Sequence, residues 1–207
     1  MLTLVLADSE LELVPAESQR HPAVRSFAKK RGRPPASILL DSSIHHPALK
    51  GVREGERRGR PDIAHIVLVT ALDSILNLEG GLRLFLHTRN DEVIQVAPET
   101  RVPKNYTRFV GLMEDLFEKG EVPEGTPLLH MDRGVTLKDL LGRFGGTRWA
   151  FAEDGEPIDL ASAIAEFGGG DLVAVVGGFP QLGGHRHEAR PDPRRWVRRH
   201  RSRGCAA

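Results

Sequence analysis

The sequence predicts an α/β fold in which a parallel sheet carries an added β-hairpin, and three observations support this. The second half alternates segments of helical and strand-like periodicity, which is typical of parallel sheets with helical connections. Two short alternating segments, LRLFLHT (82–88) and EVIQVAP (92–98), flank a polar RND turn and predict the hairpin. The apolar run DLVAVVGGFP (171–180) predicts a buried strand that ends in a glycine turn.

The first sixty residues carry weaker signals. LTLVLADSELELV (2–14) begins as an alternating strand, and Ser9 is a suitable N-cap for a helix that follows it. Residues 20–37 are basic, contain prolines and have almost no large apolar side chains, so we expect an exposed loop. ILLD (38–41) has the form of a short buried strand that leads into a functional loop, SSIHH (42–46).

The remaining elements follow in order. IAHIVLVTALDSILN (63–77) fits helix or strand by periodicity, and its length favours a helix. YTRFVGLMEDLFEKG (106–120) has apolar residues at helical spacing and ends at a glycine, which predicts an amphipathic helix. The elements expected after it are strand LLHM (128–131), helix TLKDLLGRFG (136–145), strand RWAFAE (148–153), helix DLASAIAEFG (159–168) and the strand within 171–180.

The composition is that of an ordinary water-soluble chain with one sizeable domain. Apolar residues make up 40%, and no apolar run approaches the roughly 20 residues that span a membrane. The first segment carries Asp8 and Glu10 and has no basic lead, so we expect no signal peptide. The one cysteine, Cys205, excludes an internal disulfide and suits the cytoplasm, where we expect the protein.

Charge is distributed unevenly along the chain, whose net charge is +1. Residues 181–207 contain eight arginines against Glu188 and Asp192, a net charge of +6 that leaves −5 for residues 1–180. An extended basic field therefore cannot explain nucleic-acid binding by the main part of the chain. Local clusters of cations would be required.

The four residues RGRP occur twice, in KKRGRPPAS (29–37) and in ERRGRPDIAHIVL (56–68). In the second copy, Asp62 follows Arg60 by two residues. Its carboxylate can hold the guanidinium in a fixed fork, or it can cap the following helix, and the cap alone is the commoner arrangement.

A second group of cations lies at the start of a predicted helix. ETRVPKNYTRFVGLM (99–113) places Arg101, Lys104 and Arg108 at spacings of three and four residues, on one side of a helical or tightly turned segment. Cations near a helix start are unfavourable to the helix dipole, so their position indicates an anionic partner. A solvated basic face is the alternative.

The glycine pair at Gly177 and Gly178 follows a buried strand directly. Glycines at the carboxyl end of a parallel strand allow a ligand to approach the backbone, but a tight turn without a ligand uses them equally well. His45, His46 and His65 lack a metal-ligand spacing and have no cysteine partners, so we expect no metal site.

Taken together, LLDSSIHH, RGRPDIAHIVL, LFLHTRNDEVIQVAPETRVPKNYTRFVGLMEDLF and VVGGFP resemble one family, in this order. It comprises the archaeal and eukaryotic ribosome-biogenesis methyltransferases that act on a pseudouridine in small-subunit ribosomal RNA. They belong to the SPOUT, or α/β-knot, class, and the resemblance covers about residues 1–182. It implies a SPOUT-like parallel sheet flanked by helices, a deep C-terminal trefoil knot and a homodimer.

The resemblance also implies an activity, transfer of a methyl group from S-adenosyl-L-methionine to N1 of the pseudouridine. The implied partners are small-subunit rRNA, a second copy of the chain and proteins of a nascent ribosomal particle, with no membrane. Asp62 would hold an RNA-binding arginine or act as a base. The residues implied to face RNA are Arg60, Asp62, Arg101, Lys104 and Arg108. The residues implied to bind the methyl donor are Gly177, Gly178, Phe179 and Gly183.

Only one of the two RGRP copies matches this family pattern. The copy at 58–61 belongs to a family motif, and we expect it to contact RNA. The copy at 31–34 lies outside any matching motif, and we interpret it as a flexible arm that makes at most auxiliary RNA contacts.

After GGFP, the chain departs from the family pattern. Family members continue with a helix, a further strand and a last apolar helix that completes the knot. Here an arginine-rich segment follows, in which no strand or core helix is predicted. We therefore expect a methyltransferase domain at 1–182, with the basic loop 20–37 inside it, and a disordered tail at 183–207.

This departure has two explanations: a truncated or frame-shifted reading of an intact ancestor, or a divergent tail that binds RNA. Either leaves the knot and the donor site incomplete and predicts poor solubility from an uncovered apolar face. The alternative function is therefore a catalytically impaired rRNA-binding assembly factor. A DNA-binding protein is a third interpretation, which depends only on RGRPP and the number of arginines.

Overall fold

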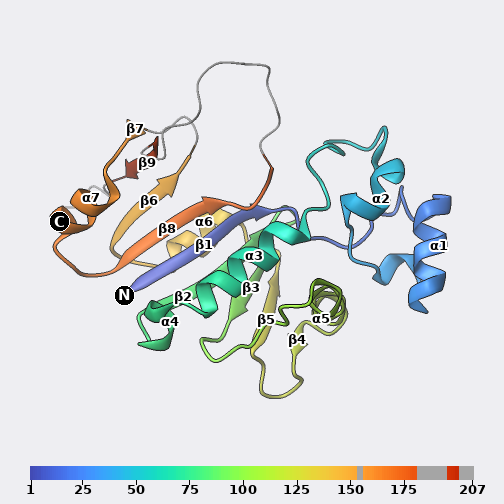
Figure 1. Cartoon of the computed structure of the whole chain (residues 1–207), viewed down its shortest axis with the longest axis horizontal. Helices are drawn as coiled ribbons and strands as arrows, with labels where there is room; N and C mark the ends of the chain where they lie inside the picture. The colour runs from blue at the N-terminus through green and yellow to red at the C-terminus, as the bar shows by residue number, and fades with distance from the viewer. Residues whose placement is uncertain (153–155, 181–194, 201–207) are drawn as a thin grey trace.

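The computed structural model describes residues 1–152, 156–180 and 195–200, with 156–157 and 195–200 described by their backbone alone. In this part of the chain, the strands form one mixed sheet in the order β4-β5-β3-β2-β1-β8-β6-β9-β7 (Figure 1). The strands are β1 Leu2–Ser9, β2 Leu82–Thr88, β3 Glu92–Val96, β4 Glu121–Val122, β5 Leu129–Arg133, β6 Thr147–Phe151, β7 Glu156–Pro157, β8 Leu172–Gly177 and β9 Arg195–His200.

The centre of the sheet is parallel and its edges are antiparallel. β1 pairs in parallel with β2 on one side and with β8 on the other, and β8 pairs in parallel with β6. The expected hairpin, β2–β3, is confirmed, and β5 continues it antiparallel to β3. The predicted parallel sheet is thus restricted to four central strands, because the hairpin and the strand after it form an antiparallel edge.

Helices cover both faces of this sheet. Leu6 of β1 and the buried side chains of α3 and α5 form the larger core, whereas its neighbours Val5 and Ala7 point to the opposite face, where α6 packs. Figure 1 shows α3 and α5 on one side of the sheet and α6 behind it. The helices are α1 Pro22–Arg31, the short 3-10 helix η1 Pro35–Ser37, α2 Ser42–Leu49, α3 Pro61–Leu72, α4 Ile75–Leu78, α5 Tyr106–Lys119, α6 Leu137–Gly142 and α7 Leu160–Phe167.

Residues 20–37 are not the exposed loop that the sequence predicted. His21 accepts a hydrogen bond from the backbone N–H of Ala23, Pro22 opens α1, and Gly32 closes it in the left-handed conformation. Few apolar residues are available, but Val24 and Ala28 are buried against α2 and the segment around Ile38. A helix with so narrow an apolar stripe has almost no periodic signal in sequence.

The first RGRP copy is part of this contact and is not a flexible arm. Arg31 forms an ion pair of 2.6 Å with the fully buried carboxylate of Glu114 on α5. Arg33 pairs with Asp115 and, at 3.4 Å, with Glu118 on the same helix. Glu114 also accepts a hydrogen bond of 3.2 Å from the backbone N–H of Leu39. These arginines therefore hold α1 and η1 against α5.

Replacing Arg31 by glutamine is expected to lower the free energy of unfolding by about 1–3 kcal/mol, because Glu114 would lose a charged partner at a buried position. Arg25→Gln, at an exposed position of the same helix, is the control. Urea unfolding of both variants measures the difference. Equal unfolding midpoints would show that this segment is not held to α5 in solution.

Two local predictions near the N-terminus are wrong. Ser9 does not cap a helix, because its hydroxyl donates to the carbonyl of His87 at 2.9 Å and the chain after it stays extended, with a bridge from Leu13 to Leu39. SSIHH is not a loop, because the side chain of Asp41 caps the N–H of Ser43 and starts α2.

The arginine-rich segment contains a strand where none was expected. β9 pairs antiparallel with β6, next to the parallel β8–β6 pair. The edge of β6 presents backbone donors and acceptors that an extended segment can satisfy, whatever its side chains. Residues 183–194 and 201–207 lie outside the described residues, so the expectations of a disordered tail and an incomplete knot stay predictions for them. None of the described helices is long and apolar enough to cross a membrane.

Candidate functional site

Three helices begin close together on one side of the molecule. Asp41 caps α2, Arg60 precedes α3, and Asn105 caps α5 by accepting from the N–H of Arg108 at 3.1 Å. The hydroxyl of Tyr106, the first residue of α5, donates to Asp41 at 2.6 Å and so ties two of these starts together. Burial and the adjacent Asp41 carboxylate raise the pKa of Tyr106 well above its ordinary range, so the hydroxyl remains a donor.

Arg60 and Asp62 form a two-pronged ion pair at the start of α3. The Nε and Nη2 atoms of Arg60 lie 2.8 and 2.7 Å from the two carboxylate oxygens of Asp62. The hydrogen bond from Arg60 lowers the pKa of Asp62 below its ordinary value, although burial opposes this. Asp62 therefore stays ionised and fixes the orientation of the guanidinium, which favours a positioning role over proton abstraction.

The lowered pKa of Asp62 predicts a pH dependence of stability. Its carboxylate contributes stability in full above its ordinary pKa, and this contribution is lost as pH falls through the lower folded-state pKa. The difference in Tm between the wild type and Asp62→Asn should therefore shrink as pH is lowered from about 6 to about 2. Thermal unfolding across this range measures it. A difference that stays constant with pH would contradict the ion pair.

The other three predicted cations are exposed, Arg101 and Lys104 on the segment before α5 and Arg108 in its first turn. Arg101, Lys104 and Arg108 all face solvent, and among the described residues no carboxylate lies within ion-pair distance of Arg101 or Arg108. Lys104 is 78% exposed and pairs with Asp73 at 2.9 Å. Together with the ends of α3 and α4, Arg101 and Lys104 line a pocket of about 390 Å³.

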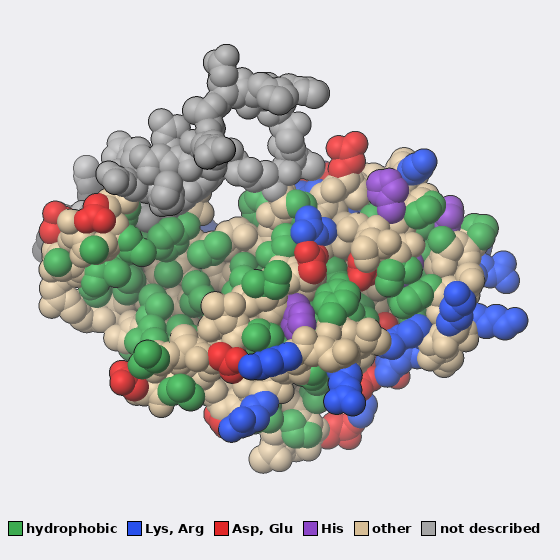
Figure 2. All heavy atoms as spheres, in the orientation of Figure 1, with side chains coloured by type: hydrophobic (Ala, Val, Ile, Leu, Met, Phe, Trp, Pro, Cys, Tyr) green, Lys and Arg blue, Asp and Glu red, His purple; other side chains and the backbone are tan. Residues whose placement is uncertain are grey.

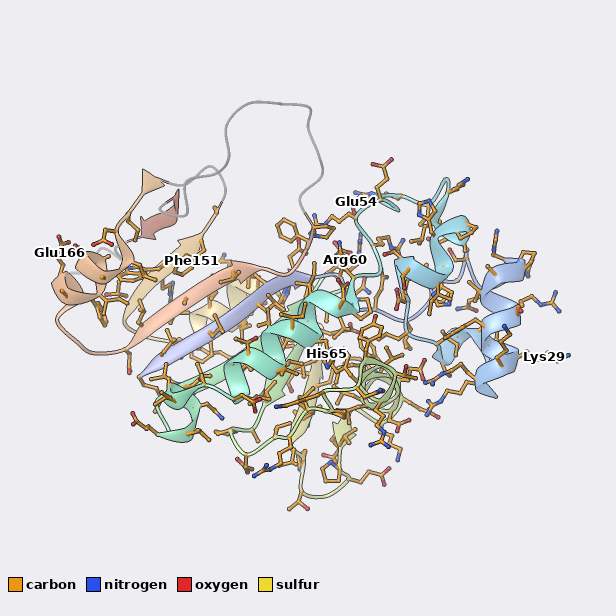
Figure 3. All side chains as sticks on the ribbon, in the orientation of Figure 1. Lys29, Glu54, Arg60, His65, Phe151 and Glu166 are labelled. Carbon is orange, nitrogen blue, oxygen red and sulfur yellow. The ribbon has the colours of Figure 1, made fainter. Side chains whose placement is uncertain are left out.

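His65 holds this segment in place, a role that the sequence did not reveal. Its Nε2 lies 2.8 Å from the carbonyl oxygen of Pro103, which requires the ring nitrogen to donate. Its ring stacks on Phe109 of α5 with centroids 4.4 Å apart. Figure 3 shows His65 on α3, below Arg60 in this view, on the side toward α5. In the part of the chain that the structure describes, no cluster of His, Cys, Asp and Glu could hold a metal ion.

Gly178 lies against the central strand β1, beyond the end of β8. Its N–H donates to the carbonyl of Ala7 at 2.7 Å, and its own carbonyl accepts from the N–H of Glu10 at 3.1 Å. A Cβ at this position would lie 2.5 Å from the Cβ of Ser9. The close approach of the strands thus explains Gly178 without a ligand, which favours the tight-turn interpretation for this residue.

Phe179 next to it is 41% exposed, and the guanidinium of Arg57 lies 4.3 Å from the centre of its ring. The atoms nearest to a Cβ on Gly177 would be those of this ring, the first of them at 2.9 Å. Gly183, the fourth predicted donor-binding residue, lies outside the described residues. The described part of the predicted donor site is therefore a short turn, Gly177–Phe179, at the carboxyl end of β8.

Charged side chains that sequence analysis did not single out surround the carboxyl end of β1. Glu10 is fully buried and contacts Arg57 and, at 2.6 Å, Arg89. Burial raises the pKa of Glu10, and the two arginines oppose this. Glu12 receives two hydrogen bonds, of 2.8 and 2.7 Å, from Arg58. The two arginines of the second RGRP copy therefore differ, because Arg58 is buried in an internal ion pair whereas Arg60 is partly exposed.

Comparisons with known proteins agree with this architecture. The model of the family described as EMG1/NEP1 methyltransferase matches residues 4–192. The ribosomal RNA small subunit methyltransferase Nep1 of Thermococcus onnurineus is 51% identical over 184 residues, which cover 87% of this chain and 83% of that protein. The protein of the same name from Pyrococcus furiosus is 51% identical over 183 residues, which cover 86% of this chain and 81% of that protein.

A solved structure is also similar. Archaeoglobus fulgidus Nep1 bound to S-adenosylhomocysteine superposes with a TM-score of 0.77 at 40% sequence identity, over 89% of this chain and 81% of that one. The resemblance noted in the sequence is thereby confirmed: this chain belongs to the EMG1/NEP1 methyltransferase family.

Proposed function

We propose that this protein methylates N1 of a pseudouridine in small-subunit ribosomal RNA during ribosome biogenesis, with S-adenosyl-L-methionine as the methyl donor. The observation that carries the proposal is its 51% identity to relatives named ribosomal RNA small subunit methyltransferase. Arg101 and Lys104 lie near the C-terminal end of α3, Arg108 lies in the first turn of α5, and the Arg60–Asp62 pair lies at the start of α3. These exposed or half-exposed cations supply an extended surface for such a substrate.

On the RNA side, Arg101, Lys104 and Arg108 bind phosphates and position the strand, while Arg60 contacts the nucleotide near the reacting base. Because the target base in a folded RNA is stacked, it has to be extruded before a methyl group can reach it. A guanidinium oriented by Asp62 loses little freedom when it binds, so each contact it makes costs less entropy. Lys104 exchanges its exposed partner Asp73 for a phosphate oxygen.

On the donor side, the described residues fit one wall of a site for S-adenosyl-L-methionine. The turn Gly177–Phe179 lies at the carboxyl end of a central parallel strand, the edge of an α/β sheet where ligands bind. When bound, this donor supplies an electrophilic methyl group on a sulfonium. The exposed ring of Phe179 provides an apolar surface, and further contacts are assigned to residues beyond it, Gly183 among them.

The transfer would form the N1–CH3 bond, break the S–CH3 bond to leave S-adenosylhomocysteine, and release the N1 proton to water, so that no strong base is required in this site. The lowered pKa of Asp62 makes its carboxylate a weak acceptor that is already engaged by Arg60. Alignment of the extruded base with the methyl donor therefore supplies most of the rate, since close and oriented reactants can account for about 7–11 kcal/mol of a barrier.

We further propose that the protein acts as a cytoplasmic homodimer, with proteins of the nascent ribosomal particle as additional contacts. Large apolar side chains are exposed on α3 and α4 and favour self-association. They are Ile66 (64% exposed), Ile75, Leu76 and Leu78 (77% exposed). Figure 2 shows hydrophobic side chains gathered over α3, α4 and α7, whereas Lys and Arg gather over α1 and α5.

The first test is calorimetric titration of S-adenosylhomocysteine into the chain, followed by a methyl-transfer assay on a loop RNA. The assay compares RNA that contains pseudouridine with the same RNA that contains uridine. Donor binding and transfer to the pseudouridine RNA alone would support the proposal. RNA binding without donor binding would leave the alternative, an rRNA-binding assembly factor that lacks catalysis. Preference for duplex DNA at fixed salt would contradict both.

A further inference from the structure

Glu10 connects the two halves of the proposed site through its backbone. Its N–H donates to the carbonyl of Gly178, in the proposed donor turn, at 3.1 Å. Its carbonyl accepts from the N–H of Arg60, the proposed RNA contact, at 3.1 Å. A single residue that follows the central strand is therefore hydrogen-bonded both to the proposed donor turn and to the proposed RNA contact.

The side chain of Glu10 reinforces this connection. The carboxylate of Glu10 contacts both Arg57 and Arg89. The guanidinium of Arg57 also lies 4.3 Å from the centre of the Phe179 ring. Arg89 also donates a hydrogen bond of 2.7 Å to Glu54, which lies on the segment that leads to Arg60. In Figure 3, Glu54 and Arg60 lie on consecutive parts of this segment, at the carboxyl end of β1.

A buried cluster of charges is an unfavourable way to gain stability alone. Glu10 is fully buried, and the side chains of Arg57 and Arg89 are only 19% and 14% exposed, so removing these charges from water is costly and their attraction only partly offsets the cost. Buried ion pairs of this kind can instead hold one arrangement of the chain against others, and here the arrangement concerns the donor turn and Arg60.

We propose that Glu10, Arg57 and Arg89 form a positioning unit that fixes the Gly177–Phe179 turn relative to Arg60 and Asp62 and thereby aligns methyl donor and RNA. Call these three residues the Glu10 unit. The inference rests on the proposed function, because it assigns the turn to the donor. None of the three residues has to touch a reacting atom, since the unit acts through Phe179 and through the backbone of Glu10.

Arg57→Met tests this role with little risk to the fold. Glu10→Gln would disturb a fully buried site, whereas Arg57 is partly exposed and methionine retains apolar contact with Phe179. Arg53→Met is the matched control, because it removes one positive charge from the same segment at an exposed position. Both variants therefore lose the same general electrostatic attraction for RNA, and any further difference between them reflects the position of Arg57.

Three quantities are measured for both variants: the single-turnover rate at saturating donor and RNA, the Kd of S-adenosylhomocysteine and the Kd of the loop RNA. We expect Arg57→Met to lower the rate by about tenfold or more relative to Arg53→Met, because misplacement of reacting groups by 1 Å can cost about a hundredfold. The RNA Kd of the two variants should agree within about threefold. Equal rates and equal donor affinity would overturn the inference.

Hydrogen exchange of peptides within 172–180 gives a readout that does not depend on catalysis. Arg57→Met should accelerate exchange at the Gly177–Phe179 turn but not within α3, whereas Arg53→Met should change neither. Phe179→Leu alone and combined with Arg57→Met completes a double-variant cycle. If Arg57 acts through Phe179, the second substitution adds little to the first. Additive effects would reject this route.

The failure of the proposed function would look different. In that case the wild-type chain itself would neither bind S-adenosylhomocysteine nor methylate the RNA, and the assignment of the turn to the donor would fall with it. A wild type that binds and methylates, with Arg57→Met unchanged in rate, donor affinity and exchange, would overturn the Glu10 unit alone.

Discussion

Arg60→Ala is expected to weaken binding of the pseudouridine-containing RNA by about tenfold to a hundredfold, the usual effect of removing an arginine that contacts the recognised nucleotide. The ion pair with Asp62 already holds the Arg60 guanidinium in one orientation. Arg60 therefore loses little conformational entropy when it contacts the RNA, and the substitution removes a favourable contact. Fluorescence anisotropy at fixed salt measures the Kd.

Arg83→Ala is a suitable control for this result. Arg83 lies on β2 with its guanidinium 5.6 Å from the ring of Phe144, on the face of the sheet that α6 covers. Its loss removes the same charge at a distance from the proposed RNA surface. Equal effects of the two variants would show that Arg60 contributes only to the general electrostatic attraction.

Arg58→Ala is expected to lower the free energy of unfolding by about 3–5 kcal/mol, because it leaves the carboxylate of Glu12 buried with only Arg89, 3.9 Å away, as a charged partner. Arg58 makes two short hydrogen bonds to Glu12, and both side chains are almost completely buried. Urea unfolding followed by circular dichroism measures the change.

The double variant Glu12→Met with Arg58→Met is compared with Arg58→Ala. Replacing both charges by apolar side chains of similar size should restore most of the lost stability, as for other buried ion pairs. Lys104→Ala, which breaks an exposed pair, should leave the unfolding midpoint unchanged. A small effect of Arg58→Ala would mean that water reaches Glu12.

Strong local signals account for the parts of the fold that the sequence predicted. The β2–β3 hairpin has two alternating strands around a polar turn, and α5 has a full apolar face and ends at Gly120 in the left-handed conformation. α1 was missed because only Val24 and Ala28 among its residues are buried. In the hairpin and in α5, the apolar pattern of the sequence matches the side chains that are buried. In α1, contacts with residues distant in sequence stabilise the helix instead.

The exposure of the predicted cations followed from the sequence, whereas the contacts between distant residues around the candidate site did not. Arg101 and Arg108 could be singled out because cations at a helix start have no local reason to be there. The contacts of Glu10 with Arg57 and of Arg31 with Glu114 join positions 47 and 83 residues apart. No local pattern connects such pairs. The sequence therefore did not show that Arg31 and Arg33 are held by carboxylates of α5 and that Arg58 is held by Glu12.

The place of β1 in the sheet has a consequence for synthesis of the protein. This strand leaves the ribosome before both of its neighbours, because Leu2 pairs with Leu82 on one side and with Leu172 on the other. At a translation rate of about 5–20 residues per second, its second neighbour emerges on the order of ten seconds after it. During that interval an apolar strand lacks one partner and is open to wrong pairing. Chaperones that cover nascent chains should therefore raise the yield of folded protein, more than for a protein whose first strands pair with each other.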